Sequence, residues 1–301
     1  VEIQYKWEGR FPAVQIGMLQ PDEEDLIEQA VSLAKEVDAV VMVVGTNSDW
    51  ETEGNDRSTL QLPGDQDELI DRVVKANPNT VVVVNTGSPI SMPWIKDTKS
   101  ILQCWFPGQE FGNALYNILF GEVNPSGKLP TTFPKSLKDT PAFNHYPGEN
   151  LQMDYLEEIF VGYRWYEKEK IKPLFPFGFG LSYTSFEYSN LRIIPPKQED
   201  SAIAFSFKVT NTGGIRGKEA TQCYVSVHNS SIERAPKELK RFSKVDLEVG
   251  ETKELTFELT ERDLSYWNES AGSWAVEPAE YRIHVGGSSE ETPLEASTWL
   301  G

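Results

Sequence analysis

One short stretch of the chain gathers the side chains best suited to chemistry. In GTNSDWETEGNDRSTLQLPG, residues 45–64, four carboxylates lie within eight positions: Asp49, Glu51, Glu53 and Asp56. Carboxyl groups can donate or accept a proton during a reaction, so a cluster of them is a candidate acid–base site. Trp50 adds an aromatic surface among them. This acidic loop, residues 45–64, is therefore the first place to look for function.

The segment before the acidic loop predicts where the loop lies. Residues 39–44, AVVMVV, form an uninterrupted apolar run. Such a run is typical of a strand buried on both faces, as in a parallel sheet covered by helices. Open α/β sheets usually bind ligands at the carboxyl ends of their strands. We expect the acidic loop to leave the strand at that edge, with Glu53 open to solvent.

Helix and strand alternate along the first half of the chain. Asp22 is the expected cap of a helix before the first strand, and Asp65 is the expected cap of the helix after the acidic loop. Further buried strands are expected over residues 80–84 and 100–105, followed by another helix. The pattern predicts an α/β domain in which helices flank a mainly parallel sheet, an α/β sandwich.

The second half of the chain follows a different pattern. After Gly121, segments rich in proline, glycine and aromatic residues predict an ordered connection that packs across a domain surface. From Phe186 onward, segments such as IAFSFKVTN and EYRIHVGG alternate apolar and polar residues with period two. They predict an all-β antiparallel immunoglobulin-like sandwich. In it, we expect inward side chains from one strand to meet those of a neighbouring strand: Phe205, Phe207 and Val209 with Tyr224, Val225 or Val227.

These patterns divide the chain into four parts. Residues 1–20 are expected to end a preceding segment or linker, and residues 21–150 to form the α/β domain. Residues 151–184 form the predicted aromatic connector, and residues 185–301 the sandwich. The sequence starts at Val1 without a signal-peptide pattern, which indicates a mature product or a piece of something longer.

Composition narrows the possible partners. The chain has 301 residues, with 46 acidic and 28 basic side chains and a formal charge of −18. This charge opposes binding to nucleic acids and to anionic membranes. The apolar runs are far shorter than the roughly 20 residues of a membrane helix, so we expect a soluble protein, either cytoplasmic or secreted. The two cysteines, Cys104 and Cys223, are expected to be separate thiols rather than a disulfide.

No cofactor or metal ion is expected. The acidic loop has too few glycines for a dinucleotide-binding fingerprint. GEVNPSGKL departs from the phosphate-binding loop in both its spacing and its last residue. The three histidines are scattered along the chain, without the spacing of a zinc site.

Several long segments resemble family 3 glycoside hydrolases of the β-glucosidase type. They include the acidic loop, NTGSPISMPW, CWFPGQEFGNALYNILFGEVNPSGKLPTTFPKS, FVGYRWYEKEKIKPLFPFGFGLSYTSFEYSNL and VTNTGGIRGKEATQCYV. The resemblance covers nearly the whole chain from about residue 20. It implies an α/β sandwich domain followed by a fibronectin type III-like domain. In that family an N-terminal (β/α)8 barrel precedes these two modules.

The resemblance also implies a division of catalytic labour. The family uses a retaining mechanism, with a nucleophilic Asp from the barrel and a general acid/base Glu from a loop of the α/β domain. The matching position in WETEGNDR is Glu53. Retaining glycosidases need two carboxyl groups about 5 to 5.5 Å apart. Asp49 stands in SDW, a tripeptide similar to that of the barrel nucleophile, but in the wrong domain, so it is not expected to act in catalysis.

The neighbours of Glu53 have more open roles. Trp50 could cover a sugar face or fix the loop to the sheet. Asn55 stands where family members often have an aromatic residue, so a stacking contact at the substrate site is absent or moved. Arg57 is expected to hold the loop by pairing with neighbouring acids, and Asp56 is a further expected support.

Three hypotheses for the function remain open. The first is the C-terminal part of a retaining β-glucosidase, acting on β-linked glucosides or oligosaccharides with a barrel of the same enzyme. The second is a carbohydrate-binding fragment without catalysis. The third keeps the enzyme class but changes the substrate to β-xylosides, arabinosides or N-acetylglucosaminides. The intact WETEG stretch favours an enzyme over a binding fragment, and sugar specificity is expected to reside mainly in the barrel.

Overall fold

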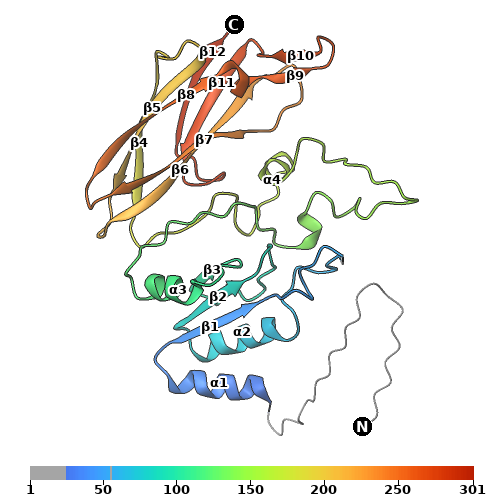
Figure 1. Ribbon diagram of the computed structural model, residues 1–301, viewed down its shortest axis with the longest axis vertical. Coiled ribbons are helices and arrows are strands. Elements are labelled where there is room, and N and C mark those ends of the chain that lie inside the picture. The colour runs from blue at the N-terminus through green and yellow to red at the C-terminus, as the bar shows by residue number, and fades with distance from the viewer. Residues whose placement is uncertain (1–24, 55) are drawn as a thin grey trace.

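The computed structural model describes residues 25–54 and 56–301, which form three stacked levels (Figure 1). An α/β layer lies at one end, an antiparallel sandwich lies at the other, and long connecting segments run between them. The predicted linker over residues 1–20, the predicted cap Asp22 and the site residue Asn55 lie outside the described residues.

The α/β layer confirms the predicted parallel sheet flanked by helices. Strands β1, β2 and β3 pair in that order and run parallel. The strands span Val40–Gly45, Thr80–Asn85 and Ser100–Gln103, and helices α1, α2 and α3 span Leu26–Glu36, Gln66–Ala76 and Phe111–Leu119. Strand β3 ends at Gln103, two residues earlier than expected, and Trp105 beyond it has a positive φ of 56°. A positive φ is incompatible with an extended strand.

Helix α1 begins later than the sequence predicted. Its N-cap is Asp25, whose carboxylate accepts hydrogen bonds from the backbone N–H groups of Ile27, at 2.9 Å, and Glu28. The assignment of the cap to Asp22 was therefore wrong. Asp65 does precede helix α2, but its side chain makes no capping hydrogen bond. The first turn of α2 instead carries Asp67 and Glu68, which interact favourably with the positive end of the helix dipole.

The prediction that β1 is buried on both faces was wrong. Met42 and Val44 are buried and share one core with Ile70 and Val73 of α2. On the other face, Val41 is 50% exposed and Val43 is 55% exposed. The helices α1 and α2 thus cover one face of β1, and the side chains alternate between buried and exposed.

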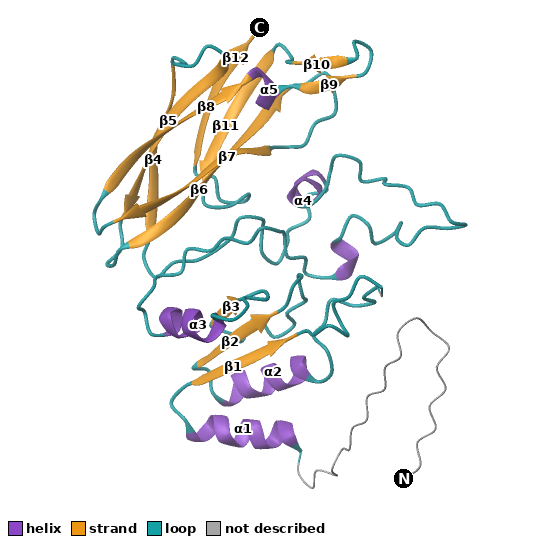
Figure 2. Cartoon of the chain, viewed as in Figure 1, coloured by secondary structure: helices purple, strands orange, loops and turns teal. Residues whose placement is uncertain are grey.

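The sandwich contains two sheets of antiparallel strands, as predicted (Figure 2). One sheet has the order β4-β5-β8 and the other has the order β12-β11-β6-β7. The strands are β4 Phe186–Ile194, β5 Ser201–Asn211, β6 Gly217–His228, β7 Glu238–Leu247, β8 Thr252–Thr260, β11 Ala279–Gly286 and β12 Leu294–Leu300. Helix α5, Glu261–Leu264, and a small hairpin of β9, Tyr266–Asn268, and β10, Ser273–Ala275, follow β8.

The sandwich core differs from the sequence prediction in two respects, the sheet that holds the partner strand and the direction of Tyr224. Phe205 and Phe207 of β5 are fully buried, as expected. They share the core with Cys223 and Val225 of β6, which belongs to the opposite sheet and is not a neighbouring strand. Tyr224 points to the other side of β6 and is also fully buried. Strand β6 is therefore covered on both of its faces over this stretch.

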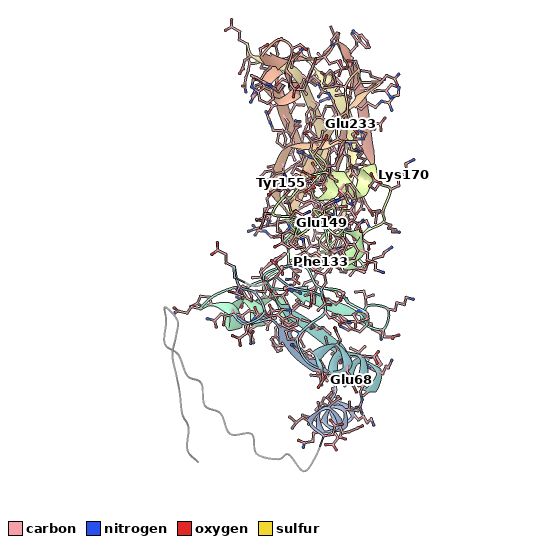
Figure 3. The ribbon with its side chains drawn as sticks, turned by 90° about the vertical axis from the view of Figure 1, so that its right-hand side faces the viewer. Glu68, Phe133, Glu149, Tyr155, Lys170 and Glu233 are labelled. Atoms are coloured by element: carbon pink, nitrogen blue, oxygen red, sulfur yellow. The ribbon has the colours of Figure 1, made fainter. Side chains whose placement is uncertain are left out.

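The aromatic connector covers the outer face of β6. Tyr163 packs edge-on against Tyr224, with 5.8 Å between the ring centroids, and stacks on Phe177 at 5.0 Å. On its other side the connector meets the α/β layer, where Phe175 bridges to Phe133 in an antiparallel pair. Figure 3 places Phe133 between the sandwich and the sheet below it. Part of the connector, including Tyr155, is nevertheless exposed.

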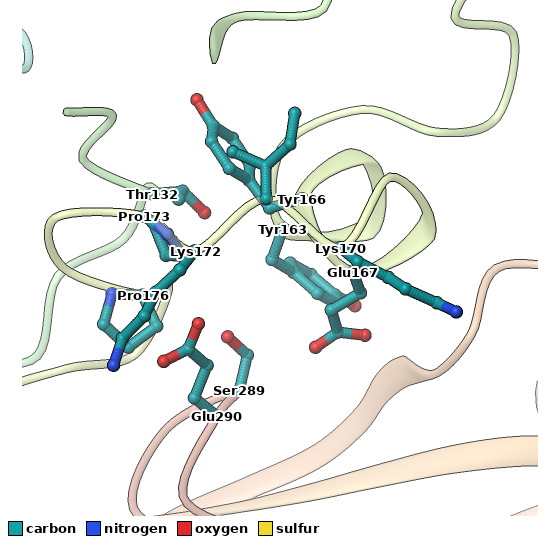
Figure 4. Close-up of a pocket in the computed structure, with 11 residues that line it drawn as sticks. Thr132, Tyr163, Tyr166, Glu167, Lys170, Lys172, Pro173, Pro176, Ser289 and Glu290 are labelled. Atoms are coloured by element: carbon teal, nitrogen blue, oxygen red, sulfur yellow. The ribbon is translucent and has the colours of Figure 1, made fainter. Parts of the chain in front are cut away.

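Helix α4, Tyr163–Lys168, fastens the connector to the start of β7 through four polar contacts. The Tyr163 hydroxyl accepts a hydrogen bond from the backbone N–H of Leu239 at 2.8 Å. Three ion pairs add to it: Arg164–Glu238, Glu167–Lys237 and Lys168–Glu233. Beside them lies a cavity of 410 Å³, where Glu167 faces Thr132, Ser289 and Glu290 (Figure 4). Burial raises the pKa of Glu167 to about 7, although the Lys237 charge opposes this shift.

The two faces of the parallel sheet predict different mutational costs. Val84→Ala, in the core, should lower the free energy of unfolding by about 2 kcal/mol, because it leaves a cavity. Val43→Ala, on the exposed face of β1, should change it by less than about 0.5 kcal/mol. Urea denaturation of both variants checks this. A comparable cost at Val43 would mean that this face is covered in solution.

The raised pKa of Glu167 predicts a pH-dependent stability. Between about pH 4.5 and 7 the folded chain retains a proton on Glu167 that the unfolded chain has lost, so this group's stabilising contribution falls as pH rises through that window. Glu167→Gln should flatten the change in unfolding free energy between pH 5 and 8. Glu233→Gln removes an exposed acid from the same contact region and is the matched control. An unchanged slope in Glu167→Gln would contradict the expectation.

Candidate functional site

Glu53 lies where the sequence predicted. It occupies an exposed turn in the acidic loop, which leaves the carboxyl end of β1 at Gly45. Because β2 is parallel and in register, with Gly45 opposite Asn85, the loop that follows β2 emerges at the same edge. The two loops can therefore support each other.

The start of the acidic loop is fixed by a close approach of the two strands. A Cβ on Gly45 would lie 2.2 Å from the carbonyl oxygen of Asn85, so only glycine fits there. The Gln66 side chain accepts a hydrogen bond from the Gly45 N–H at 2.8 Å and donates one to its carbonyl oxygen at 3.0 Å. Helix α2 thus holds the point from which the loop departs.

Glu51 is bound to the neighbouring loop. One of its carboxylate oxygens accepts a hydrogen bond from the Gly87 N–H at 2.9 Å and another from the Thr46 hydroxyl. Glu51 is half-buried, whereas Glu53 and Asp49 are exposed. The sequence contains no local pattern that brings residues 51 and 87 together, so this role of Glu51 was not predicted.

Arg57 holds the far side of the loop, but through a different partner from the one expected. Its Nη1 donates a hydrogen bond to the Ser88 hydroxyl at 2.7 Å rather than to a neighbouring acid. Burial lowers the pKa of the Arg57 guanidinium, and the charge of Glu51 opposes this shift. The Nε and Nη2 atoms are buried without a hydrogen-bond partner in the described part of the chain.

Other loop residues also have defined surroundings. Asp56 accepts a hydrogen bond from the Tyr146 hydroxyl at 2.6 Å, which links the acidic loop to a distant segment. The Asn47 side-chain oxygen accepts hydrogen bonds from the backbone N–H groups of Asp49 and Trp50, the first at 3.1 Å. These bonds stabilise the first turn of the loop. Trp50 is half-buried, and its indole N–H is buried without a partner among the described residues.

The arrangement leaves Glu53 accessible for proton transfer but not enclosed. The cavity beside α4 and a second one of 570 Å³ near His228 and Trp299 are both lined by residues far from the acidic loop in sequence. Across the described ranges 25–54 and 56–301, no group of three His, Cys, Asp or Glu side chains is placed to hold a metal ion. No helix of that part is long and apolar enough to cross a membrane. Both cysteines are free.

Comparison with known proteins agrees with the architecture of both modules. Residues 4–183 match the glycosyl hydrolase family 3 C-terminal domain, and residues 219–289 match a fibronectin type III-like domain. The chain therefore belongs to glycosyl hydrolase family 3. This confirms the resemblance inferred from the sequence segments.

Two relatives of similar identity are named as beta-glucosidases. A putative beta-glucosidase of Schizosaccharomyces pombe is 44% identical over 287 residues, covering 95% of this chain and 34% of that protein. Thermostable beta-glucosidase B of Acetivibrio thermocellus is 45% identical over 276 residues, covering 91% of this chain and 37% of that protein.

Solved structures of the family have the same fold. The beta-glucosidase of Kluyveromyces marxianus, in complex with glucose, matches with a TM-score of 0.87 and 44% identity, covering 95% of this chain and 34% of that chain. A family 3 beta-glucosidase of Bifidobacterium adolescentis matches with a TM-score of 0.88 and 40% identity, covering 94% and 42%. The chain thus spans between 34% and 42% of the length of these relatives.

The hydrogen bond between Tyr146 and Asp56 predicts coupling between two segments. Tyr146→Phe should speed backbone hydrogen exchange in the acidic loop while lowering global stability by no more than about 1 kcal/mol, because the bond is exposed. Exchange measured by mass spectrometry checks this. Tyr155→Phe, which alters an exposed tyrosine of the connector, is the control. Unchanged exchange in Tyr146→Phe would show that the bond does not restrain the loop.

Proposed function

We propose that this chain is the acid/base-bearing part of a retaining β-glucosidase, and that Glu53 is its general acid/base. The observation that carries the proposal is the contrast between two loop carboxylates. Glu53 is exposed at the carboxyl edge of the sheet, whereas Glu51 is bound to the Gly87 N–H and the Thr46 hydroxyl. A proton donor has to reach the substrate, and Glu53 is free to do so.

Glycoside hydrolysis assigns Glu53 two successive tasks. As an acid it protonates the departing glycosidic oxygen while a second carboxylate attacks the anomeric carbon and forms a glycosyl-enzyme bond. As a base it then removes a proton from the water that breaks this bond. In the proposed enzyme the nucleophilic Asp belongs to a (β/α)8 barrel, as the resemblance to family 3 glycoside hydrolases implies.

The proposed substrates are terminal non-reducing β-D-glucosyl residues of glucosides or oligosaccharides. The names of the relatives and the glucose complex of the Kluyveromyces marxianus enzyme support glucose over xylose, arabinose or N-acetylglucosamine. Trp50 and Asn55 are the residues of this loop proposed to contact the substrate. Arg57 and Asp56 are proposed to support the loop through their bonds to Ser88 and Tyr146.

This chain is proposed to be inactive without the barrel. General acid catalysis contributes typically about 10² to 10⁴ in rate, and only when the sugar is held against the nucleophile. The competing function, a carbohydrate-binding fragment without catalysis, predicts sugar affinity in this chain alone and no gain of activity on mixing. Mixing the purified chain with a separately produced family 3 barrel and assaying an aryl β-glucoside separates the two functions.

Replacement of Glu53 should have an effect that depends on the leaving group. In the assembly with the barrel, Glu53→Ala should lower kcat/KM for alkyl glucosides by about 10² to 10⁴, and for dinitrophenyl glucoside by less than about tenfold, because that leaving group needs no protonation. Asp49→Asn, an exposed acid of the same loop, is the control and should have little effect. Equal losses on both substrates in Glu53→Ala, or a dominant loss in Asp49→Asn, would overturn the assignment.

A further inference from the structure

We infer that Glu51 and Arg57 are positioning residues that hold Glu53 in place by fastening both ends of its turn to the Gly87–Ser88 segment. This inference rests on the proposed role of Glu53 and assigns Glu51 a task distinct from acid–base catalysis. Glu51 precedes Glu53 by two residues, and Arg57 follows it by four. Both reach the same two residues beyond β2: Glu51 contacts Gly87 and Arg57 contacts Ser88.

The contact between Glu51 and Gly87 is tight. A Cβ added to Gly87 would lie 2.5 Å from Glu51 Oε2 and 2.6 Å from the Phe106 ring, so glycine lets the loops approach. Glu51 Oε1 meanwhile accepts hydrogen bonds from the Gly87 N–H and the Thr46 hydroxyl. Both donors bind the same carboxylate oxygen, so these two hydrogen bonds fix the position of the Glu51 side chain.

Arg57 completes the attachment on the other side of the turn. Its bond to the Ser88 hydroxyl is 2.7 Å long and partly buried. The charges of Arg57 and Glu51 attract each other across the base of the turn. Glu53 lies between these two attached residues in the sequence, and its side chain is exposed. Since the hydrogen bonds of Glu51 and Arg57 go to Gly87, Thr46 and Ser88, both residues are inferred to act on the reaction through the position of Glu53.

Two replacements of Glu51 distinguish a positioning role from a proton-donor role. Glutamine keeps a side-chain oxygen that can accept from Gly87 and Thr46, whereas alanine removes it. A proton donor, in contrast, is lost equally on replacement by either residue. Loss of the Glu51 hydrogen bonds should lower kcat/KM most for poor leaving groups, because these need the proton from Glu53. A displacement of about 1 Å in a catalytic group can lower the rate about 100-fold.

The kinetic test uses the assembly of this chain with the barrel. Glu51→Ala should lower kcat/KM about 10- to 100-fold for alkyl glucosides and much less for dinitrophenyl glucoside. Glu51→Gln should lose no more than about fivefold, because it keeps the acceptor oxygen and loses only the charge attraction to Arg57. Equal, large losses in Glu51→Gln and Glu51→Ala would overturn the inference and make Glu51 a proton donor. A loss that is the same on every substrate would indicate general destabilisation and would also overturn it.

A second test needs this chain alone. The Gly87 amide should exchange slowly with deuterium in the unchanged chain and in Glu51→Gln, and rapidly in Glu51→Ala, as measured by NMR. Gly87→Ala displaces the carboxylate without altering Glu51 and should reproduce the kinetic loss of Glu51→Ala. Exchange at Gly87 that is unaffected in Glu51→Ala, or full activity of Gly87→Ala, would contradict the inference.

The outcomes separate this inference from the proposed function. If Glu53→Ala keeps the activity on alkyl glucosides, the proposed function fails whatever Glu51 does. If Glu53→Ala loses it and Glu51→Ala does not, Glu53 remains the acid/base and only the positioning role of Glu51 is overturned.

Discussion

The parallel register of β1 and β2 is the constraint on which the site depends. Gly45 stands opposite Asn85, so the chain leaves both strands at the same height and at the same edge. The two loops that follow these strands are therefore adjacent. The side chains of Glu51 and Arg57 are long enough to reach Gly87 and Ser88. A register shift of one residue would reverse the faces of the side chains and separate these partners.

The sequence predicted the parts of the fold that periodicity encodes. Continuous valines indicated the parallel strands, and strict alternation indicated the sandwich, because these patterns reflect burial along one element. Whether a strand is buried by helices or segments that are distant in the sequence could not be predicted from the pattern of the strand itself. Val41 and Val43 look identical to the buried Val44 in sequence, yet they face the side that α1 and α2 leave uncovered. Tyr224 is buried by the connector, and nothing within β6 indicates this.

The same distinction applies to the site. The position of Glu53 followed from a motif and from the edge rule for α/β sheets. The partners of the loop did not, since hydrogen bonds between residues 51 and 87 or 56 and 146 depend on tertiary structure. The remaining signal was Gly87 in NTGSPI, because a glycine after a buried strand can mark a close backbone approach. The acids near Arg57 in sequence pointed to the wrong partner, because adjacency along a loop does not fix where a side chain points.

Neighbouring carboxylates in one loop can thus have opposite duties. A carboxylate that fixes backbone geometry does so through the hydrogen bonds that its oxygens accept. A carboxyl that transfers protons has to alternate between its two forms and reach a substrate atom. Glu51 makes such hydrogen bonds, and the exposed Glu53, two positions further on, is the residue proposed for proton transfer. On the proposed roles, two of the four carboxylates of the acidic loop have separate tasks, one in holding the loop and one in proton transfer, and Asp56 adds a contact to Tyr146.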